Sequence, residues 1–347
     1  MNKFKEFLKR KNIEVSFKRY GLDALSYMAL GLFSTLIIGL IIKTIGEQVA
    51  ILAGENSICT LLIELGKTTM GLMGAGIGVA VSYALGAPPL VLFCGIVTGT
   101  LGAMGNGGPA GAFITAAIGC EFGKAVSKET KLDIIVTPGT TLIIGLIAAK
   151  TVAPLVGFLM TGLGEVIMRA TELQPFLMGI VISVIMGVVL TAPISSAALA
   201  VALNLSGLAA GAATVGCSAQ MIGFAVMSYK ENKFGGFVAQ GLGTSMLQVP
   251  NILKNFWTIL PPILSSAVLG PISTLVFRME NNPAGAGMGT SGLVGQINTF
   301  TVMGFSLPVL LEVLLLHFIL PAILTYVFYI ILKRLGKIKD GDLTLDL

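Results

Sequence analysis

The sequence predicts an all-α membrane protein that crosses the bilayer many times. Hydrophobic residues make up 54% of the chain, charged residues only 11%, and the mean hydropathy is +0.91. A soluble domain carries about 25% charged residues, so a water-soluble fold would leave too much apolar surface to bury. Several apolar segments reach the roughly 20 residues that a helix needs to cross a bilayer. Their continuous rather than alternating pattern indicates helices and not barrel strands.

The first 20 residues are basic and amphipathic. "MNKFKEFLKRKNIEVSFKRY" contains seven lysine and arginine residues against Glu6 and Glu14. Such a segment is typical of an amphipathic helix on the anionic cytoplasmic leaflet, so we expect a cytoplasmic helix at residues 1–20. The alternative is a solvated tail. The positive charge also predicts a cytoplasmic N-terminus.

The spanning segments follow in order. The first is expected at residues 22–42, and the polar loop after it lacks Lys and Arg beyond Lys43, which places this loop outside. "KRLGKIK" follows the last apolar segment and predicts a cytoplasmic tail at residues 336–347. With both termini inside, residues 21–335 form a membrane domain with an even number of crossings, roughly eight to ten. The other apolar segments lie at residues 69–86, 89–104, 134–160, 176–190, 195–208, 209–229, 259–277 and 307–332.

Two glycine-rich polar segments interrupt the apolar pattern. They are "GNGGPAGAF" at residues 105–113 and "NNPAGAGMGTSGLVGQ" at residues 281–296. Non-helical backbone at membrane depth is tolerated only where it is buried in protein or lines a cavity. We therefore expect two re-entrant hairpins, at residues 105–113 and 281–298, with external loops as the alternative. Neither segment ends in the Gly-Lys-Ser/Thr of a phosphate-binding loop.

Amide and carboxylate side chains in or near these segments are the candidate substrate-binding groups. A polar ligand buried in a membrane cavity needs a partner for each of its hydroxyls, and such side chains can provide them. The candidates are Asn106, Asn281, Asn282, Gln296, Asn298 and Glu312.

Two titratable residues are the candidate catalytic groups. A carboxylate in apolar surroundings is expensive and marks a site, and Glu280 directly precedes an Asn-Asn-Pro turn. The alternative is that Arg278 merely neutralises it. His317, the single histidine, lies on the last long helix, where a packed and satisfied side chain is the alternative to a proton acceptor. One histidine and four dispersed cysteines lack metal-ligand spacing, so neither a metal nor a cofactor is expected.

The two polar segments and the basic N-terminal helix carry a family resemblance. "ENNPAGAGMGTSGLVGQI" and "GNGGPAGAF" resemble the integral membrane IIC components of the phosphotransferase system. More narrowly, the chain is similar to the stand-alone IIC-like branch that includes perfringolysin-regulator-type proteins. The resemblance covers nearly the whole chain. It implies a homodimeric permease of the plasma membrane that binds a sugar in a cavity roofed by re-entrant hairpins.

The resemblance also implies a partner protein. In typical members a cytoplasmic IIB protein phosphorylates the sugar, a glutamate precedes a proline-containing re-entrant turn, and a separate histidine lies near the sugar. Glu280 matches the glutamate, whereas His317 is the available histidine but does not match in its helix position. No polar segment is long enough for a IIA or IIB domain, so a separate IIB protein is the expected phosphate donor.

Other classes of function are weighed against this one. The net charge of +5 lies in the termini and short loops, so nucleic acid is not an expected partner. A transporter-derived membrane sensor or regulator without phosphotransfer stays open as the alternative. A channel or ion-coupled transporter of another substrate is the third class.

Overall fold

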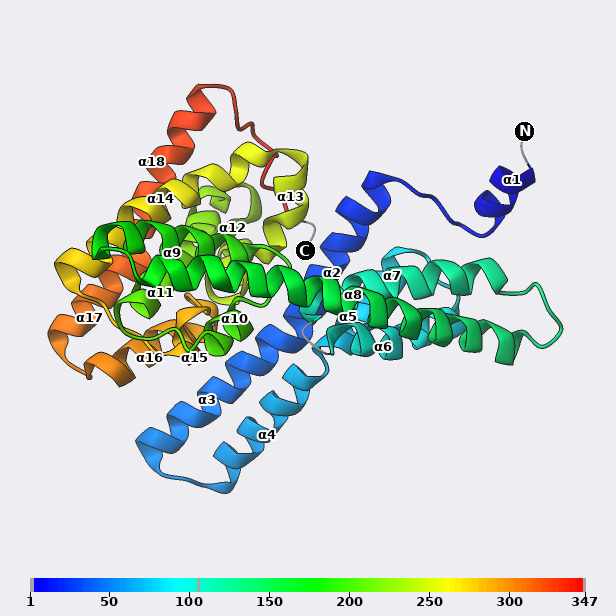
Figure 1. Cartoon of the computed structure of the whole chain (residues 1–347), viewed down its shortest axis with the longest axis horizontal. Helices are drawn as coiled ribbons and strands as arrows, with labels where there is room; N and C mark the ends of the chain where they lie inside the picture. The colour runs from blue at the N-terminus through cyan, green and yellow to red at the C-terminus, as the bar shows by residue number, and fades with distance from the viewer. Residues whose placement is uncertain (1–2, 105–106, 346–347) are drawn as a thin grey trace. The chain divides into compact units, whose positions relative to one another are not determined.

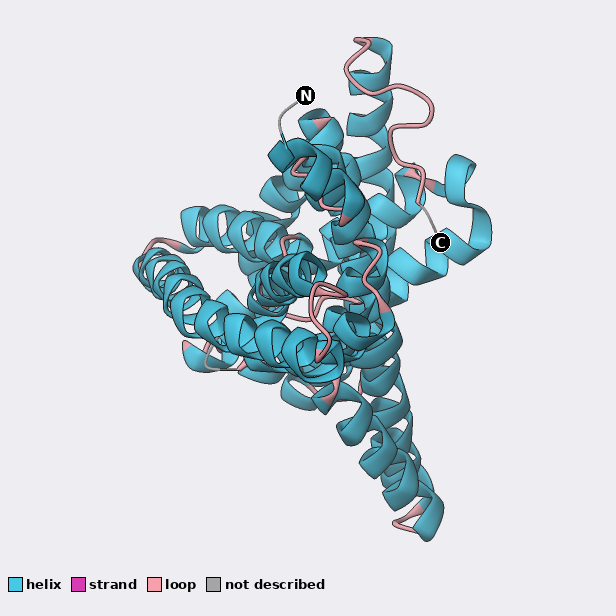
Figure 2. Ribbon diagram, turned by 90° about the vertical axis from the view of Figure 1, so that its right-hand side faces the viewer, coloured by secondary structure: helices cyan, strands magenta, loops and turns pink. Residues whose placement is uncertain are grey.

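The computed structural model describes residues 3–104 and 107–345. Every regular element within these residues is a helix, and their strand-like pairing is limited to an isolated antiparallel bridge between Gly207 and Asn281 (Figure 2). The all-α fold class is therefore confirmed. The chain divides into two compact units, Met1–Leu159 and Met160–Leu347, whose helices are labelled in Figure 1.

Five of the described helices are long and apolar enough to cross a membrane. A sixth candidate is the pair α4 (Ser57–Gly71) and α5 (Met73–Ala84), which is bent by 48°. Helices α6 (Pro89–Ala103) and α9 (Pro175–Thr191) are also apolar but contain only 15 and 17 residues. The multi-pass class is confirmed, and the count of roughly eight to ten crossings stays a prediction. The five single spans are Lys18–Ile51, Asp133–Thr171, Gly207–Met227, Phe256–Phe277 and Leu307–Arg334.

The first unit begins with a short helix that is anchored to a turn. Helix α1 (Lys3–Arg10) ends at Arg10, whose Nη2 lies 2.8 Å from Oε1 of Glu129, and Lys11 pairs with the same carboxylate. The hydrogen bond from Lys11, aided by Arg10, holds the pKa of Glu129 below its usual range. The basic segment is thus attached to the turn after α7 (Gly108–Val126), and its contact with a bilayer surface stays a prediction. The other helices of this unit are η1 (Lys18–Ala24), α2 (Leu25–Leu32), η2 (Phe33–Ile37), α3 (Ile38–Ala53) and the first part of α8 (Asp133–Thr171).

Helices α5 and α6 pack with their backbones in direct contact. A Cβ atom at Gly78 would lie 1.9 Å from the carbonyl oxygen of Gly95, and one at Gly95 would lie 2.6 Å from the carbonyl oxygen of Gly78. Lipid tails give helices no hydrophobic reason to associate, so van der Waals contact at such close approach holds them together.

The segment at residues 105–113 differs from the predicted hairpin in its described part. Residues 108–113 form the first turns of α7, with Pro109 in the first turn, where its missing N–H costs nothing. The helix then continues without a break to Val126 because small apolar residues follow the proline. Asn106 lies outside the described residues.

We expect Gly78→Ala to lower the stability of the protein by about 1–3 kcal/mol, because the added methyl group overpacks the α5–α6 contact. Gly162→Ala on α8 is the matched control, since a Cβ atom there meets nothing within 4 Å. Thermal unfolding of both variants in detergent checks this. Equal melting temperatures for Gly78→Ala and the unmodified protein would contradict the packing argument.

Helix α11 (Gly207–Met227) is the centre of the second unit. It is 94% buried over its spanning window and packs against α9, α14 (Leu260–Pro271) and α18 (Leu320–Arg334). Its sequence is dominated by Gly, Ala, Ser, Thr and Cys, so neighbouring backbones approach it closely. The other elements are α10 (Ser196–Ala202), α12 (Tyr229–Val238), η3 (Ala239–Gly243), η4 (Ser245–Gln248), α13 (Val249–Lys254), η5 (Phe256–Ile259), η6 (Ile272–Phe277), α15 (Pro283–Ala286), η7 (Ser291–Leu293), α16 (Val294–Met303), α17 (Leu307–Leu314) and η8 (Leu315–Ile319).

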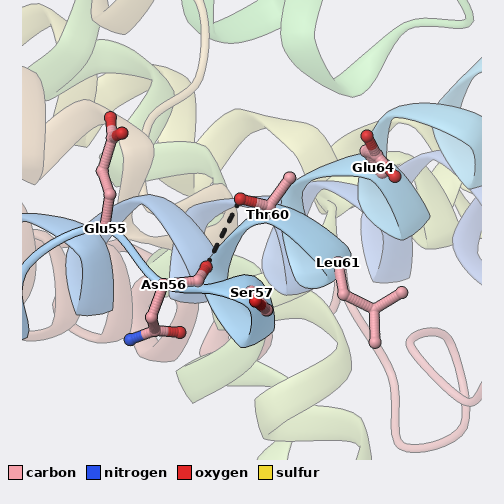
Figure 3. Close-up of a pocket in the computed structure, with 6 residues that line it drawn as sticks. All are labelled: Glu55, Asn56, Ser57, Thr60, Leu61 and Glu64. Atoms are coloured by element: carbon pink, nitrogen blue, oxygen red, sulfur yellow. Dashed lines mark hydrogen bonds between the residues drawn. The ribbon is translucent and has the colours of Figure 1, made fainter.

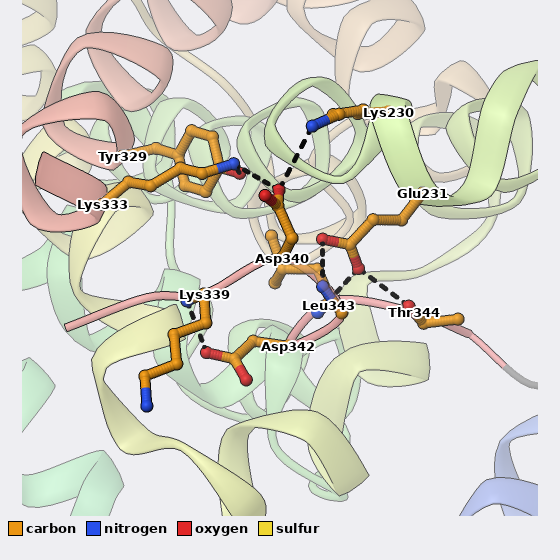
Figure 4. A network of polar contacts seen from close by, with 10 residues as sticks. Lys230, Glu231, Tyr329, Lys333, Lys339, Asp340, Asp342, Leu343 and Thr344 are labelled. Atoms are coloured by element: carbon orange, nitrogen blue, oxygen red, sulfur yellow. Dashed lines mark hydrogen bonds and ion pairs between the residues drawn. The ribbon is translucent and has the colours of Figure 1, made fainter. Parts of the chain in front are cut away.

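The C-terminal residues after α18 dock onto α12 and α13. The carboxylate of Glu231 accepts hydrogen bonds from Gly341 N at 3.1 Å, Leu343 N at 3.0 Å and Thr344 Oγ1 at 2.9 Å (Figure 4). The side chain of Leu343 is fully buried. Residues 336–345 are therefore a folded part of this unit, and their position on the cytoplasmic side stays a prediction. Three amide side chains also donate to carbonyl groups of this tail: Asn232, Gln248 and Asn251.

Glu231→Ala should release this tail, because two backbone amides and one hydroxyl lose a charged acceptor. Hydrogen bonds to charged groups contribute about 1.5–3 kcal/mol, so we expect amide exchange in residues 336–345 to accelerate by tenfold or more. Hydrogen–deuterium exchange measures this directly. Glu165→Ala, an exposed carboxylate on α8, is the control, and unchanged protection in the Glu231 variant would show that the tail is held by other contacts.

Candidate functional site

The candidate site is built on residues 279–298, which we call the hairpin segment. It begins as an extended chain, in which successive side chains point to opposite sides. Met279 is fully buried, Glu280 is exposed and Asn281 is buried again. Asn281 pairs with Gly207 at the start of α11 through two backbone hydrogen bonds of 3.0 and 3.2 Å. This bridge fixes the segment against α11 and sends Glu280 and Asn281 in opposite directions.

The side chain of Asn281 is saturated with internal hydrogen bonds. Its Nδ2 lies 2.7 Å from Thr214 Oγ1, 3.0 Å from Gly295 O and 3.1 Å from Thr299 Oγ1. Its Oδ1 accepts from the backbone N–H of Asn282 at 2.8 Å. Buried polar groups need partners, and here all of them come from the protein. Asn281 therefore joins α11 to α16.

Asn282 and Asn298 organise the turn next to it. Oδ1 of Asn282 accepts from the N–H groups of Ala284 and Gly285 at 3.0 and 3.1 Å, which caps the start of α15. Its Nδ2 donates to Oδ1 of Asn298 at 2.9 Å, and Asn298 donates to Val294 O at 2.9 Å. Three of the four predicted asparagines thus form one connected network, in which Asn282 and Asn298 are half-buried.

Gln296 and His317 form a second, fully buried pair. Nε2 of Gln296 lies 3.1 Å from Nδ1 of His317, and the two side chains are 4% and 0% exposed. Two buried atoms of this pair, Oε1 of Gln296 and Nε2 of His317, have no hydrogen-bond partner among the described residues. The α16 start and the η8 turn position these side chains.

Neither of the two predicted carboxylates is hydrogen-bonded through its side chain to these networks within the described residues. Glu280 is exposed, and among the described residues no ion pair joins it to Arg278, which adopts a left-handed backbone conformation with φ of 48°. The contact that neutralisation by Arg278 requires is therefore missing. Glu312 is half-buried on α17, and its Oε2 is a buried atom without a hydrogen-bond partner in the described chain.

Several polar residues of the site are missing from the sequence-based prediction. Thr214 and Thr299 complete the shell around Asn281, and Thr290 of the hairpin segment donates to Gly241 O at 2.5 Å. The hairpin segment thus meets a second irregular segment, residues 239–248, whose Gln240 and Gln248 are fully buried and hydrogen-bonded at 2.8 Å. In the sequence, the amide side chains of Gln240 and Gln248 between weakly apolar helices are the signal that could have identified this segment.

One surface hollow contains two carboxylates but has a different character. It has a volume of about 410 Å³ at the start of α4 and lies between Glu55 and Glu64 (Figure 3). All six side chains that line it are exposed, so it lacks the desolvated polar groups that a sugar site needs. Nowhere in residues 3–104 and 107–345 do three His, Cys, Asp or Glu side chains gather as metal ligands.

Together, the apolar helices and the buried polar hairpin segment define a multi-pass membrane protein with an internal polar site. Comparison with known proteins then gives the family: the model described as "Phosphotransferase system, EIIC" matches residues 22–345. The chain belongs to this family, as the sequence resemblance predicted, and is a membrane sugar permease component of the phosphotransferase system. No curated protein and no solved structure matches the chain.

We expect Asn281→Ala to be strongly destabilising, because it leaves buried groups on Thr214, Gly295 and Thr299 without their partner. Each such group costs about 1–3 kcal/mol. Asn298→Ala is the comparison, since its half-buried partner can turn to water. Unfolding followed in detergent should rank Asn281→Ala well below Asn298→Ala, and the reverse order would contradict the assignment of Asn281 as the joint between α11 and α16.

Proposed function

We propose that this permease component binds and translocates a carbohydrate, and that the Gln296–His317 pair contacts one of its hydroxyls. This proposal rests on two buried atoms that have no hydrogen-bond partner in residues 3–104 and 107–345, namely Gln296 Oε1 and His317 Nε2. With the Gln296 amide donating to Nδ1, the neutral imidazole carries its proton on Nε2. The pair then offers one acceptor and one donor.

This inventory fits a hydroxyl group, which donates one hydrogen bond and accepts others. Turning the amide by 180° exchanges the roles of its oxygen and nitrogen but leaves one donor and one acceptor unused, so the fit does not depend on that assignment. A buried polar group without a partner costs about 1–3 kcal/mol, which a bound hydroxyl would recover. An apolar ligand would leave both atoms without a hydrogen bond, so the same free-energy cost disfavours an apolar ligand at this position.

The asparagine network has a supporting role in this proposal. Asn281 and Asn282 hold the hairpin segment in shape, so they affect the ligand through the backbone that carries Gln296. Asn106 and Glu312 stay candidates for further contacts with the sugar. Oε2 of Glu312 is a buried acceptor of the kind that a sugar hydroxyl satisfies.

For the chemical step we propose a separate cytoplasmic IIB protein as the phosphate donor. A sugar hydroxyl would attack the phosphorus atom of the phosphorylated IIB residue, the bond between phosphorus and that residue would break with the IIB side chain as leaving group, and the proton of the hydroxyl would pass to a carboxylate. Glu280 supports this role because it is exposed at the edge of the hairpin segment and carries no ion pair in the described chain. Of the two catalytic candidates, Glu280 thus accepts the proton and His317 binds.

The remaining assignments follow the charge pattern and the family. The family resemblance supports a homodimer in the plasma membrane. Both termini would be cytoplasmic, because Lys and Arg concentrate at the two ends of the chain. Residues 1–20 would lie on the membrane surface, residues 21–335 would form the membrane domain, and residues 336–347 would face the cytoplasm.

The test separates binding from chemistry in two variants. With a panel of radiolabelled sugars and a IIB partner, we expect His317→Phe to weaken sugar binding about five- to hundredfold. Glu280→Gln should instead retain binding and lower the yield of phosphorylated sugar by about a hundredfold or more. Glu165→Gln, another exposed carboxylate, controls for loss of charge.

Three outcomes would contradict the proposal. Unchanged sugar binding by well-folded His317→Phe protein would remove the pair from the site. Normal phosphorylation by Glu280→Gln would remove the carboxylate, and sugar binding without any phosphorylated product in the unmodified protein would favour the sensor alternative.

A further inference from the structure

A groove of about 630 Å³ lies between the end of α11, α12 and the last turns of α18. Apolar and aromatic side chains form most of its walls, and three lysines also line it. Tyr229 and Tyr326 are about half exposed, and Tyr229 packs edge-on against Phe237 with ring centroids 6.1 Å apart. The three lysines are Lys230, Lys233 and Lys333, and Ile330 also lines the groove.

The groove lies at the end of a spanning segment. Leu307–Arg334 is long and apolar enough to cross the bilayer, and it ends with Lys333 and Arg334. Tyrosine rings and lysines at the end of a span are typical of the membrane–water interface, where lipid headgroups lie. In a bilayer, a groove at this level would face lipid phosphates on its polar side and acyl chains on its apolar side.

The charges of the groove are unevenly balanced. Asp340 of the docked tail accepts from Lys333 at 2.5 Å and from Lys230 at 3.4 Å, so one carboxylate serves two ammonium groups (Figure 4). Hydrogen bonds from Lys333 and then Lys230 hold the pKa of Asp340 below its usual range. Glu231, the other carboxylate on α12, is occupied by the tail backbone.

Lys233 differs from the other two lysines of the groove in its side-chain contacts and in its backbone conformation. No hydrogen bond or ion pair engages its side chain within the described residues, and its φ and ψ are 54° and −157°. Non-glycine residues rarely adopt such backbone conformations, and those that do cluster at ligand sites. The kink of α12 falls at Lys233, which lines the groove together with Lys230.

We propose that this groove binds an anionic phospholipid, with its phosphate on Lys230 and Lys233 and an acyl chain along Phe237 and Ile330. The excess positive charge selects an anionic headgroup, and the apolar walls require an attached chain. A free sugar fits poorly, because tyrosine and lysine provide the only polar side chains of the lining. The site is separate from the Gln296–His317 pair, so its test does not depend on sugar transport.

The test uses the full-length protein in detergent with a fluorescent short-chain phosphatidylglycerol, and phosphatidylcholine of the same chain length as the neutral probe. Each lysine near a lipid phosphate contributes about 1 kcal/mol, so Lys230→Gln and Lys233→Gln should each weaken phosphatidylglycerol binding about fivefold. Lys254→Gln, an exposed lysine on α13 outside the groove, should leave binding unchanged. Asp340→Asn should tighten binding, because it removes the carboxylate that competes for Lys230.

Four results would overturn the proposal. Equal affinity for the two lipids would remove the charge selection, and an equal loss in Lys254→Gln would indicate unspecific attraction. Displacement of the lipid by glycerol phosphate or inorganic phosphate at similar concentration would indicate a free-anion site without a role for the chain. Unchanged binding in the Lys230→Gln/Lys233→Gln variant would locate the lipid elsewhere.

Discussion

The second unit depends on the small side chains of α11, which let neighbouring backbones contact this helix directly. A Cβ atom at Gly216 would lie 1.9 Å from Ser183 O of α9, and one at Gly211 would lie 1.9 Å from Met279 O of the hairpin segment. Larger residues at these positions would push both neighbours away from the helix. Since lipid supplies no hydrophobic drive for helix association, close backbone contact is the main source of cohesion here. A helix that is buried on all sides must therefore be built from small residues.

The hairpin segment follows from this contact. Only because Met279 O lies against α11 can Asn281 reach Thr214 on the same helix and Gly295 on the returning chain. The irregular backbone is then satisfied by the Gly207 bridge, by the Asn282 cap and by Thr290, which donates to Gly241. Non-helical chain at membrane depth requires this kind of internal satisfaction. The segment is therefore held by specific polar joints and not by apolar packing alone.

The sequence is a good guide to the class and to one half of the site. Continuous apolar runs predict the all-α fold, and the Asn-Asn-Pro turn marks the hairpin segment, because both signals are local. Burial depends on packing between segments that are distant in the chain. The small residues of α11 therefore predict only a weak span, although the same residues allow it to lie at the centre of the second unit. For the same reason the docked tail is absent from the sequence-based prediction, since Glu231 and Leu343 lie far apart in the chain. The pairing of Gln296 with His317 likewise depends on how α16 and η8 meet, which no spacing rule reveals.

Hydrogen-bond saturation separates the polar residues of this core into two groups. A side chain whose donors and acceptors are all used by the protein, as in Asn281, stabilises the fold and has nothing left for a ligand. A buried side chain with a donor or acceptor that no described residue uses, as in Gln296 and His317, is a candidate for contact with a bound polar group, because a buried polar group without a partner is costly. Both kinds occur within one hairpin segment because the second depends on the first. The asparagine hydrogen bonds hold the backbone that carries Gln296, and so they support the proposed contact between this pair and a sugar hydroxyl.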